Sequence, residues 1–159
     1  MELSYGLKDI KEAGDFILKN IKNKILLICG EVGSGKTTLV KQICEKLEVT
    51  DNVSSPTYTL INEYNSHNGL VIHMDLYRIE NKEDVNGLGL FEYFDKHFVI
   101  IEWPEIIIND LDCNHSILKI EYLNKDKRKI NLTNIKIWVF YLRTVEGIGV
   151  EYCDAWSTS

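Results

Sequence analysis

The feature that most constrains this chain is a phosphate-binding loop that directly follows a run of apolar residues. Residues 30–37 read Gly-Glu-Val-Gly-Ser-Gly-Lys-Thr, which fits the pattern G-x-x-x-x-G-K-T. The preceding residues 24–29, Lys-Ile-Leu-Leu-Ile-Cys, predict a buried strand. A strand that leads through such a loop into a helix turns backbone N–H groups toward phosphate oxygens, and the helix adds the positive end of its dipole. This order of elements predicts a site for nucleotide phosphates.

Two side chains of the loop have predicted roles at the phosphates. Lys36 is expected to reach the outer phosphates. Thr37 is expected to supply a hydroxyl for Mg²⁺, which prefers oxygen ligands shared between protein, water and phosphates. A glycine-rich turn that contains Lys and Thr by chance would have the same letters, but the strand before it and the helix after it argue against that alternative.

The composition is typical of one small domain. The chain has 159 residues, 45% of them hydrophobic, and only two prolines, so it suits a single core with no proline-rich linker. No apolar run approaches the roughly 18 residues of a membrane span, and residues 1–4, Met-Glu-Leu-Ser, lack the basic start of a signal peptide. We therefore expect a cytoplasmic protein without a membrane partner.

Cysteine spacing and charge argue against two kinds of site. Cys29, Cys44, Cys113 and Cys153 lie far apart and form no C-x-x-C pair, which argues against zinc, and the first two are expected to be reduced core residues. The formal charge of −6 argues against broad attraction to a nucleic-acid backbone, because such attraction depends on Lys and Arg. Any role in RNA metabolism is therefore expected to be indirect.

Apolar spacing predicts alternating helices and strands. A first helix is expected over residues 8–19, a strand over 24–29, and a second helix from near Lys36 to about Lys46. Further strands are expected at residues 58–63, 70–76, 98–103, 117–123 and 129–132. The polar segments 65–69 and 124–127 predict two hairpin turns.

These elements predict the fold class. The hairpins are antiparallel, whereas the continuous apolar runs 24–29 and 98–102 are typical of buried parallel strands. We therefore expect an α/β fold of the P-loop NTPase kind, with a mixed sheet, helices on both faces and antiparallel hairpins.

Two of the predicted strands end on a carboxylate. Asp75 follows Val-Ile-His-Met, and Glu102 follows Val-Ile-Ile. Ligands of such sheets collect beyond the carboxyl ends of the parallel strands, so both side chains are candidates to hold Mg²⁺ or a water molecule. Each alone could be a strand-end cap or a salt-bridge partner. The sequence does not decide which of the two contacts the metal.

Three later segments resemble a known family. Residues 55–60 (Ser-Pro-Thr-Tyr-Thr-Leu), 73–78 (His-Met-Asp-Leu-Tyr-Arg) and 101–105 (Ile-Glu-Trp-Pro-Glu) follow the loop in the order and spacing of signature blocks of the TsaE (YjeE) family. The resemblance covers residues 5–134. It implies a small bacterial ATPase that helps to make threonylcarbamoyladenosine in tRNA, together with the TsaD and TsaB proteins.

The resemblance also implies roles for matching residues. Mg²⁺ would be coordinated by Thr37 with Glu102, and Asp75 would be the Walker-B-like acid. Thr57 lies in a segment that resembles a switch, where its hydroxyl would sense the terminal phosphate, although it could be only a turn residue. We therefore predict Lys36, Thr57, Asp75 and Glu102 as catalytic, and Thr37, Asp75 and Glu102 as metal-binding. The predicted ATP-binding residues are Gly33, Ser34, Gly35, Lys36, Thr37, Thr38 and Arg128.

Three further side chains have open alternatives. Arg78 would neutralise phosphate charge or a partner's acidic surface, or would be a structural ion-pair donor. Trp103 would pack, or would contact nucleotide or a partner. Arg128 resembles a family position near the nucleotide, although three consecutive basic residues at 127–129 are usually a solvated turn.

The resemblance fades after Asn134. We therefore expect a P-loop ATPase domain over residues 1–136 and a C-terminal tail over 137–159. Residues 137–142, Ile-Trp-Val-Phe-Tyr-Leu, are interpreted as an extra edge strand or a partner-docking segment, and the remainder is expected to lack fixed structure.

Three alternative functions were weighed. Residues 81–84 spell the guanine-recognition pattern N-K-x-D, but they do not end a buried strand as in GTPases. A small-molecule kinase would usually carry an arginine-rich lid, and this chain has three scattered arginines, Arg78, Arg128 and Arg143. A nucleotide-dependent regulatory module remains open, because an ATPase this small would be slow alone and would be stimulated by partners. In every case tRNA is expected to be contacted only through the complex.

Overall fold

The computed structural model describes residues 1–137, 139–144 and 147–152. Seven strands form one mixed sheet in the order β1-β7-β6-β2-β5-β4-β3. These strands are β1 (Glu2–Gly6), β2 (Ile25–Cys29), β3 (Ile61–Ser66), β4 (Gly69–Asp75), β5 (Phe98–Glu102), β6 (His115–Asn124) and β7 (Lys127–Ile135). The helical segments are η1 (Leu7–Asp9), α1 (Ile10–Asn20), α2 (Lys36–Lys46), α3 (Lys82–Asn86), α4 (Phe91–Phe94) and η2 (Pro104–Ile106).

The centre of the sheet is parallel and its margins are antiparallel. Strand β2 pairs in parallel with both β5 and β6, and β4 pairs in parallel with β5. The hairpins β3–β4 and β6–β7 are antiparallel, and β1 adds to β7 in the same sense. In the β4–β5 register Asp75 is opposite Glu102, so the two carboxylates end neighbouring parallel strands at one edge of the sheet.

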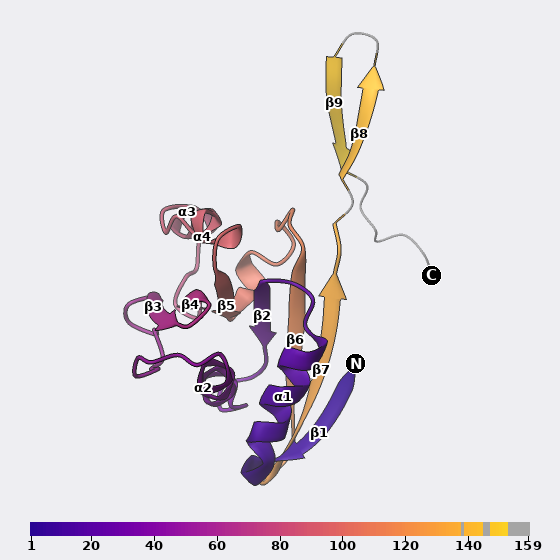
Figure 1. Cartoon of the computed structure of the whole chain (residues 1–159). Helices are drawn as coiled ribbons and strands as arrows, with labels where there is room; N and C mark the ends of the chain where they lie inside the picture. The colour runs from indigo at the N-terminus through magenta and orange to yellow at the C-terminus, as the bar shows by residue number, and fades with distance from the viewer. Residues whose placement is uncertain (138, 145–146, 153–159) are drawn as a thin grey trace.

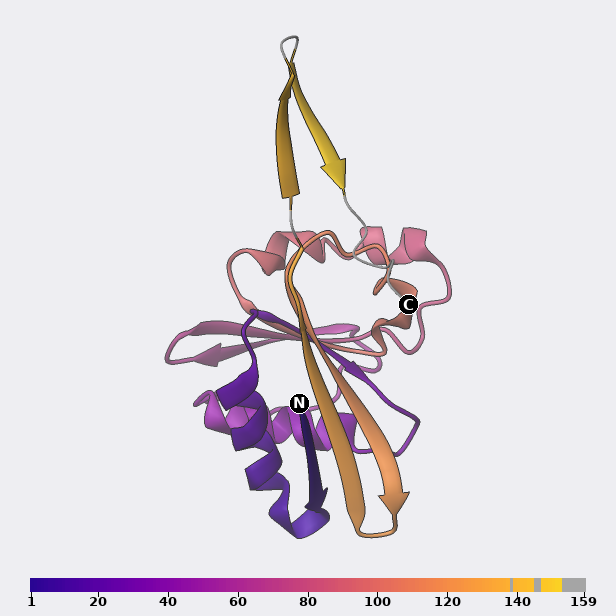
Figure 2. The ribbon, with the colours of Figure 1, turned by 90° about the vertical axis from the view of Figure 1, so that its right-hand side faces the viewer.

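Helices cover both faces of the sheet, as Figure 2 shows. Helices α1 and α2 pack on one face, where their apolar sides contribute Ile17, Leu39 and Ile43 to a core with alternate strand residues such as Leu26 and Ile100. The other face carries α3, α4 and η2, and its core includes Leu27 and Ile101. Because β2 is enclosed on both faces, four of its five residues are buried, which explains its continuous apolar run.

The predicted fold class is confirmed: the sheet is mixed, helices lie on both faces and both hairpins form. The strand expected at 58–63 begins later, at Ile61, because residues 57–59 form a turn that Leu60 ends at a φ of 65°. Strand β1 and helices α3 and α4 were not predicted. They are short, and their apolar residues show too little periodicity to mark them.

The C-terminal segment differs from expectation. Strand β8 (Val139–Thr144) pairs with β9 (Gly147–Tyr152) in a separate two-stranded antiparallel sheet (Figure 1). Residues 139–142 of the segment interpreted as an extra edge strand or a partner-docking segment therefore form a strand, but not at an edge of the main sheet, and residues 147–150 also lie in a strand. The pattern of apolar residues along a strand predicts the strand but not its neighbour, so the sequence did not show which sheet β8 joins. Residues 153–159 lie outside the described part.

The described cysteines are free thiols. Cys44 is fully buried in the core under α2, and burial raises the pKa of its thiol to about 12. Burial also raises the pKa of Cys29 and of Cys113 to about 11. Thiols with such pKa values stay protonated at neutral pH. The prediction of a reduced core residue is confirmed for Cys44, whereas Cys29 is a free thiol that is half-buried and lies outside both cores. No helix in the described residues is long and apolar enough to cross a membrane.

Candidate functional site

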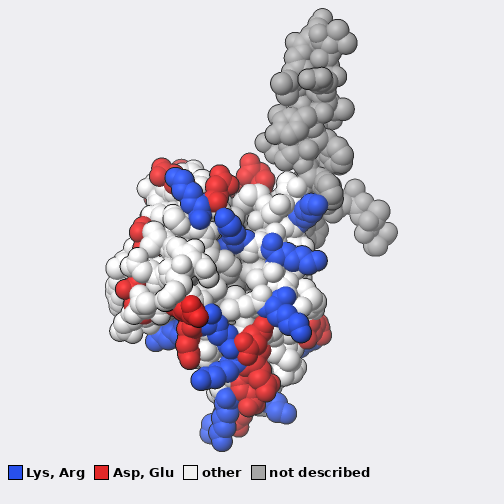
Figure 3. Space-filling view, viewed as in Figure 1, with Lys and Arg blue, Asp and Glu red and all other residues white. Residues whose placement is uncertain are grey.

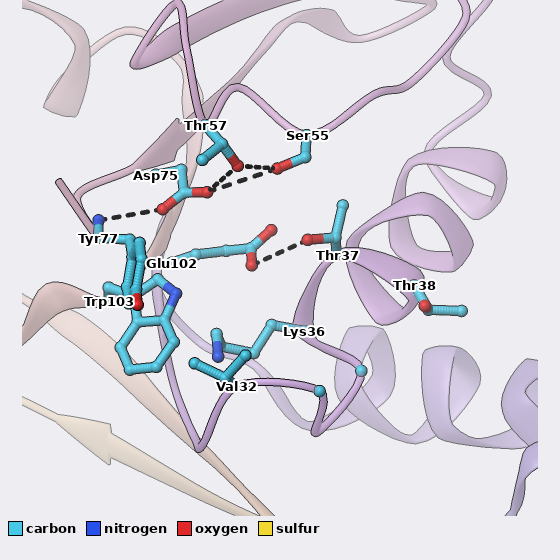
Figure 4. A pocket seen from close by; sticks show the side chains of 12 residues that line it. Val32, Lys36, Thr37, Thr38, Ser55, Thr57, Asp75, Tyr77, Glu102 and Trp103 are labelled. Carbon is cyan, nitrogen blue, oxygen red and sulfur yellow. Dashed lines mark hydrogen bonds between the residues drawn. The ribbon is translucent and has the colours of Figure 1, made fainter.

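A pocket of about 410 Å³ opens where α2 begins, at the carboxyl ends of β4 and β5. Its walls come from the phosphate loop, the start of α2, the segment before β3, and the residues that end β4 and β5 (Figure 4). The lining residues are Val32, Gly33, Gly35, Lys36, Thr37, Thr38, Ser55, Thr57, Asp75, Tyr77, Glu102 and Trp103. This is the edge of an α/β sheet at which ligands are expected.

The glycines of the loop set its curvature. Gly33 has a φ of 77° and Gly35 a φ of 101°, values that L side chains adopt with strain. Gly35 is the N-cap of α2, so the left-handed residue ends the loop and the first helical turn starts at Lys36. A side chain built on either glycine would meet no atom within 4 Å, so the backbone conformation rather than crowding requires glycine here. The open space beside both residues is the cradle that a phosphate group would occupy.

Lys36 lies along the floor of this pocket and is buried. Its Nζ donates hydrogen bonds to the carbonyl oxygens of Gly30, at 2.7 Å, and of Glu31, at 3.0 Å. The same ammonium lies 3.6 Å from the centroid of the Trp103 ring. Burial lowers the pKa of Lys36, and the carboxylates of Glu102, Glu105 and Asp75 oppose that effect because they favour the charged amine.

Glu102 and Thr37 meet across the pocket. The Thr37 hydroxyl donates to Oε2 of Glu102 at 3.0 Å, although the two residues are 65 positions apart in sequence. The other oxygen of the carboxylate, Oε1, lies 2.9 Å from Nε2 of His73, and both side chains are buried. Glu102 is therefore held by a partner on each oxygen.

Asp75 is held by a second group of residues. Thr57 donates from its hydroxyl to Oδ2 of Asp75 at 2.8 Å, and Ser55 does so at 3.4 Å. The backbone N–H of Tyr77 donates to Oδ1 at 3.0 Å. The segment before β3 is thereby fastened to the end of β4, and Thr57 faces the pocket from it (Figure 4).

The oxygen atoms of this pocket suit Mg²⁺. Thr37, Asp75 and Glu102 supply one hydroxyl and two carboxylates, and Mg²⁺ is typically bound by one or two carboxylates together with water and substrate phosphates. Among the described residues no group of three or more His, Cys, Asp or Glu side chains forms a metal cage. The donor set therefore fits a metal that arrives with phosphate better than a resident zinc or calcium ion.

Two aromatic rings border the pocket. Trp103 has a left-handed backbone, with a φ of 57°, and immediately follows Glu102. Its ring lies 4.9 Å from that of Tyr77, centroid to centroid, and the two planes are tilted by 48°. The tight turn after β5 thus brings Trp103 over Lys36 rather than into either core. Trp103 thus packs against Tyr77 and Lys36 at the pocket, and its contact with nucleotide or a partner stays a prediction.

Three predicted residues lie outside the pocket lining: Ser34, Arg78 and Arg128. Ser34 lies between the two lining glycines, and its side chain is buried. Arg128 is buried behind the loop, where its Nε donates to the carbonyl of Ser34 at 3.0 Å and its Nη1 to the carbonyls of Asn124 and Lys127. It is thus no solvated turn residue, and it contacts the backbone of the loop rather than the cradle. Arg78 is exposed and stacks on the Tyr58 ring, 4.3 Å from its centroid.

The guanine-recognition pattern is also remote from the pocket. Asn81 is the N-cap of the short helix α3, and Asp84 lies within that helix. Neither residue lines the pocket. In contrast, the pocket-lining residues Val32, Ser55 and Tyr77 received no role from the sequence. Ser55 and Tyr77 lie within the signature-like segments, which was the available signal.

Comparison with known proteins identifies relatives over most of the chain. A family described as "Threonylcarbamoyl adenosine biosynthesis protein TsaE" matches residues 6–130. A Bacillus subtilis protein named tRNA threonylcarbamoyladenosine biosynthesis protein TsaE is 38% identical over 112 residues, 70% of each chain. A Haemophilus influenzae protein of the same name is 34% identical over 125 residues, 77% of this chain and 78% of the relative.

A solved structure has the same fold. The crystal structure of YdiB from Bacillus subtilis matches with a TM-score of 0.64 and 30% identity. The match covers 84% of this chain and 86% of the other.

Proposed function

This chain belongs to the TsaE family of threonylcarbamoyl adenosine biosynthesis proteins, and we propose that it binds and hydrolyses ATP in support of that tRNA modification. A cytoplasmic location and action together with TsaD and TsaB are part of the proposal. One observation carries it. The phosphate loop, a lysine, a threonine hydroxyl and two strand-end carboxylates converge on a single pocket.

The phosphate loop and four polar side chains of the pocket have distinct tasks in this proposal. The backbone N–H groups of the loop and the N-terminus of α2 bind the phosphates, and Lys36 moves its ammonium to their outer oxygens. Thr37 and Glu102 would hold Mg²⁺, which would supply positive charge to neutralise the phosphates. Asp75 accepts a hydrogen bond from the attacking water and orients it.

Thr57 couples the phosphate site to the segment that leads into β3. Its hydroxyl bonds to Asp75, and it stands in the segment of residues 54–60 that leads into β3. A terminal phosphate in the pocket would compete for that hydroxyl, so the segment would shift between two sets of partners. We propose that this shift changes the affinity of the chain for TsaD and TsaB.

The surface supports an indirect contact with tRNA. Acidic and basic side chains are interspersed over the face shown in Figure 3, and the whole chain carries a net charge of −6. Independent binding to RNA would need basic residues gathered against phosphates. We therefore assign the chemistry on tRNA to the partner proteins.

A regulatory module with little turnover is the second candidate. The bond between Thr57 and Asp75 favours it, because it links a potential switch segment to the phosphate site whether or not hydrolysis is fast. Turnover measured with and without TsaD and TsaB separates the two. A rate that rises with the partners supports the ATPase, and a rate that stays near zero in the complete mixture supports the module.

The central experiment is a reconstituted assay that follows multiple rounds of threonylcarbamoyladenosine formation. The chain, its Lys36→Ala variant and its Thr57→Ala variant are each added to TsaD, TsaB and tRNA. We expect sustained modification only with the wild-type chain, and weaker coupling between ATP and partner affinity with Thr57→Ala. Equal support from Lys36→Ala would contradict the proposed function.

A further inference from the structure

We propose that His73 is a positioning residue that fixes the Glu102 carboxylate for Mg²⁺, an inference that rests on the proposed function. His73 lies on β4, two residues before Asp75, and is not among the residues that line the pocket. Its side chain is fully buried. A buried polar ring with a single polar partner, at the carboxylate of the site, calls for a physical explanation.

The sheet register brings the two residues together. Asp75 is opposite Glu102 and His73 is opposite Ile100, so His73 and Glu102 are diagonal neighbours on one face of two parallel strands. Diagonal neighbours on a sheet are within reach when the side chains are long. The Nε2···Oε1 distance of 2.9 Å is that of a hydrogen bond.

The contact defines the tautomer of the ring. An ionised carboxylate only accepts hydrogen bonds, so Nε2 of His73 carries the proton and donates it to Glu102. Nδ1 has no hydrogen-bond partner among the described residues. A proton on Nδ1 would therefore be a buried donor without an acceptor, so the geometry places the ring proton on Nε2.

The hydrogen bond restricts a side chain that otherwise has several rotamers. With Oε1 held by His73, the carboxylate presents Oε2 to Thr37, the second proposed ligand. Without His73, Oε1 would be buried and unpaired, and the Glu102 side chain would be free to adopt other rotamers. Partners behind metal ligands act in this way, and their loss typically weakens metal affinity by about 10- to 100-fold.

Two variants of His73 test whether a donor must reach Glu102 or whether any polar side chain at this position is enough. The amide nitrogen of Gln lies as many bonds from the backbone as Nε2 of His, whereas that of Asn lies one bond closer. His73→Gln can therefore donate to Glu102, and His73→Asn keeps an amide but falls short. Val71→Ala is the matched packing control, because Val71 is buried on the same face of the same strand.

The first readout is affinity for a non-hydrolysable ATP analogue, measured by calorimetry with Mg²⁺ and again with EDTA. Mg²⁺ should raise the affinity of the wild type for the analogue. We expect this increase to be about 10- to 100-fold smaller in His73→Asn, whereas its affinity in EDTA should equal that of the wild type. His73→Gln and Val71→Ala should keep most of that increase. The proposal would be overturned if Mg²⁺ raised the affinity of His73→Asn as much as that of the wild type. It would also be overturned if His73→Gln lost as much of the Mg²⁺ effect as His73→Asn.

A second readout needs no nucleotide. The ring nitrogens of His73 are observed by long-range ¹H–¹⁵N NMR in the wild type and in Glu102→Gln. We expect a protonated Nε2 and an unprotonated Nδ1 in the wild type, with the Nε2 resonance displaced in the variant. The opposite tautomer would overturn the role of His73. A wild-type chain that binds no ATP analogue would instead contradict the proposed function, and this measurement would still decide whether His73 holds Glu102.

Discussion

Arg128 donates a hydrogen bond from Nε to the backbone carbonyl of Ser34 at 3.0 Å, across 94 positions of sequence. Arg128 is the second residue of β7, which follows the β6–β7 turn, and its guanidinium also stacks on Tyr122, 4.4 Å from the ring centroid. The hairpin thus holds the phosphate loop from behind, at a peptide unit between the two glycines of the cradle.

This relationship predicts that Arg128→Ala loosens the loop. Because hydrogen bonds from a charged group to the backbone carbonyls of Ser34 and Asn124 are lost, we expect the free energy of unfolding to fall by about 1.5–3 kcal/mol and ATP affinity to fall with it. Urea unfolding and calorimetry measure the two quantities. Lys127→Ala removes an exposed charge from the same turn and should change neither. Equal effects of the two variants would show that charge, not the contact to Ser34, matters.

Lys36→Ala is expected to abolish productive ATP binding. The variant removes the ammonium that serves the outer phosphates, and a hydrogen bond to a charged group contributes about 1.5–3 kcal/mol. Calorimetry with ATP and Mg²⁺ tests this. Lys41→Ala, an exposed position on the same helix, is the control that should bind as the wild type does. A folded Lys36→Ala protein with wild-type affinity would refute the site assignment.

Substitutions of Glu102 and of Asp75 are expected to change different properties of the ATPase reaction. Glu102→Gln should raise the Mg²⁺ concentration needed for half-maximal ATPase activity, because Glu102 is bonded to the Thr37 hydroxyl. Asp75→Asn should mainly lower turnover, by about 10²-fold or more if Asp75 orients the water. Steady-state ATPase assays over a Mg²⁺ titration separate the two effects. The reverse pattern would exchange the roles.

ATP is expected to bind at least as well as GTP. The residues that spell a guanine-recognition pattern, Asn81 and Asp84, belong to α3 and do not line the pocket. Competition between the two nucleotides, in the wild type and in Asp84→Ala, measures the preference. A strong preference for GTP that Asp84→Ala removes would support the GTPase alternative.

Deletion of residues 137–159 is expected to leave nucleotide binding intact. Every pocket-lining residue lies earlier in the chain, and β8 and β9 pair with each other rather than with the main sheet. Calorimetry on the truncated and full-length chains tests this expectation. Loss of ATP binding by a folded truncated protein would show that the tail completes the site.

The sequence by itself determined the local parts of this molecule. The loop could be predicted because residues 30–37 are contiguous and two glycines favour the left-handed backbone that the loop requires. The buried parallel strands could be predicted because enclosure on both faces leaves a continuous apolar run. Asp75 and Glu102 could be predicted as site residues because each directly follows such an apolar run.

Only the tertiary structure decided which of these side chains meet. Strand order brings Glu102 between His73 and Thr37, and hairpin geometry brings Arg128 against Ser34. A run of letters carries no sign of such pairs, because they depend on register and on neighbours 29 to 94 positions away. His73 therefore stood in a signature-like segment without a role of its own, and Arg128 was predicted to bind ATP rather than the backbone of the loop. Burial gives each of them a defined partner, since a polar group removed from water must form its hydrogen bonds inside the protein.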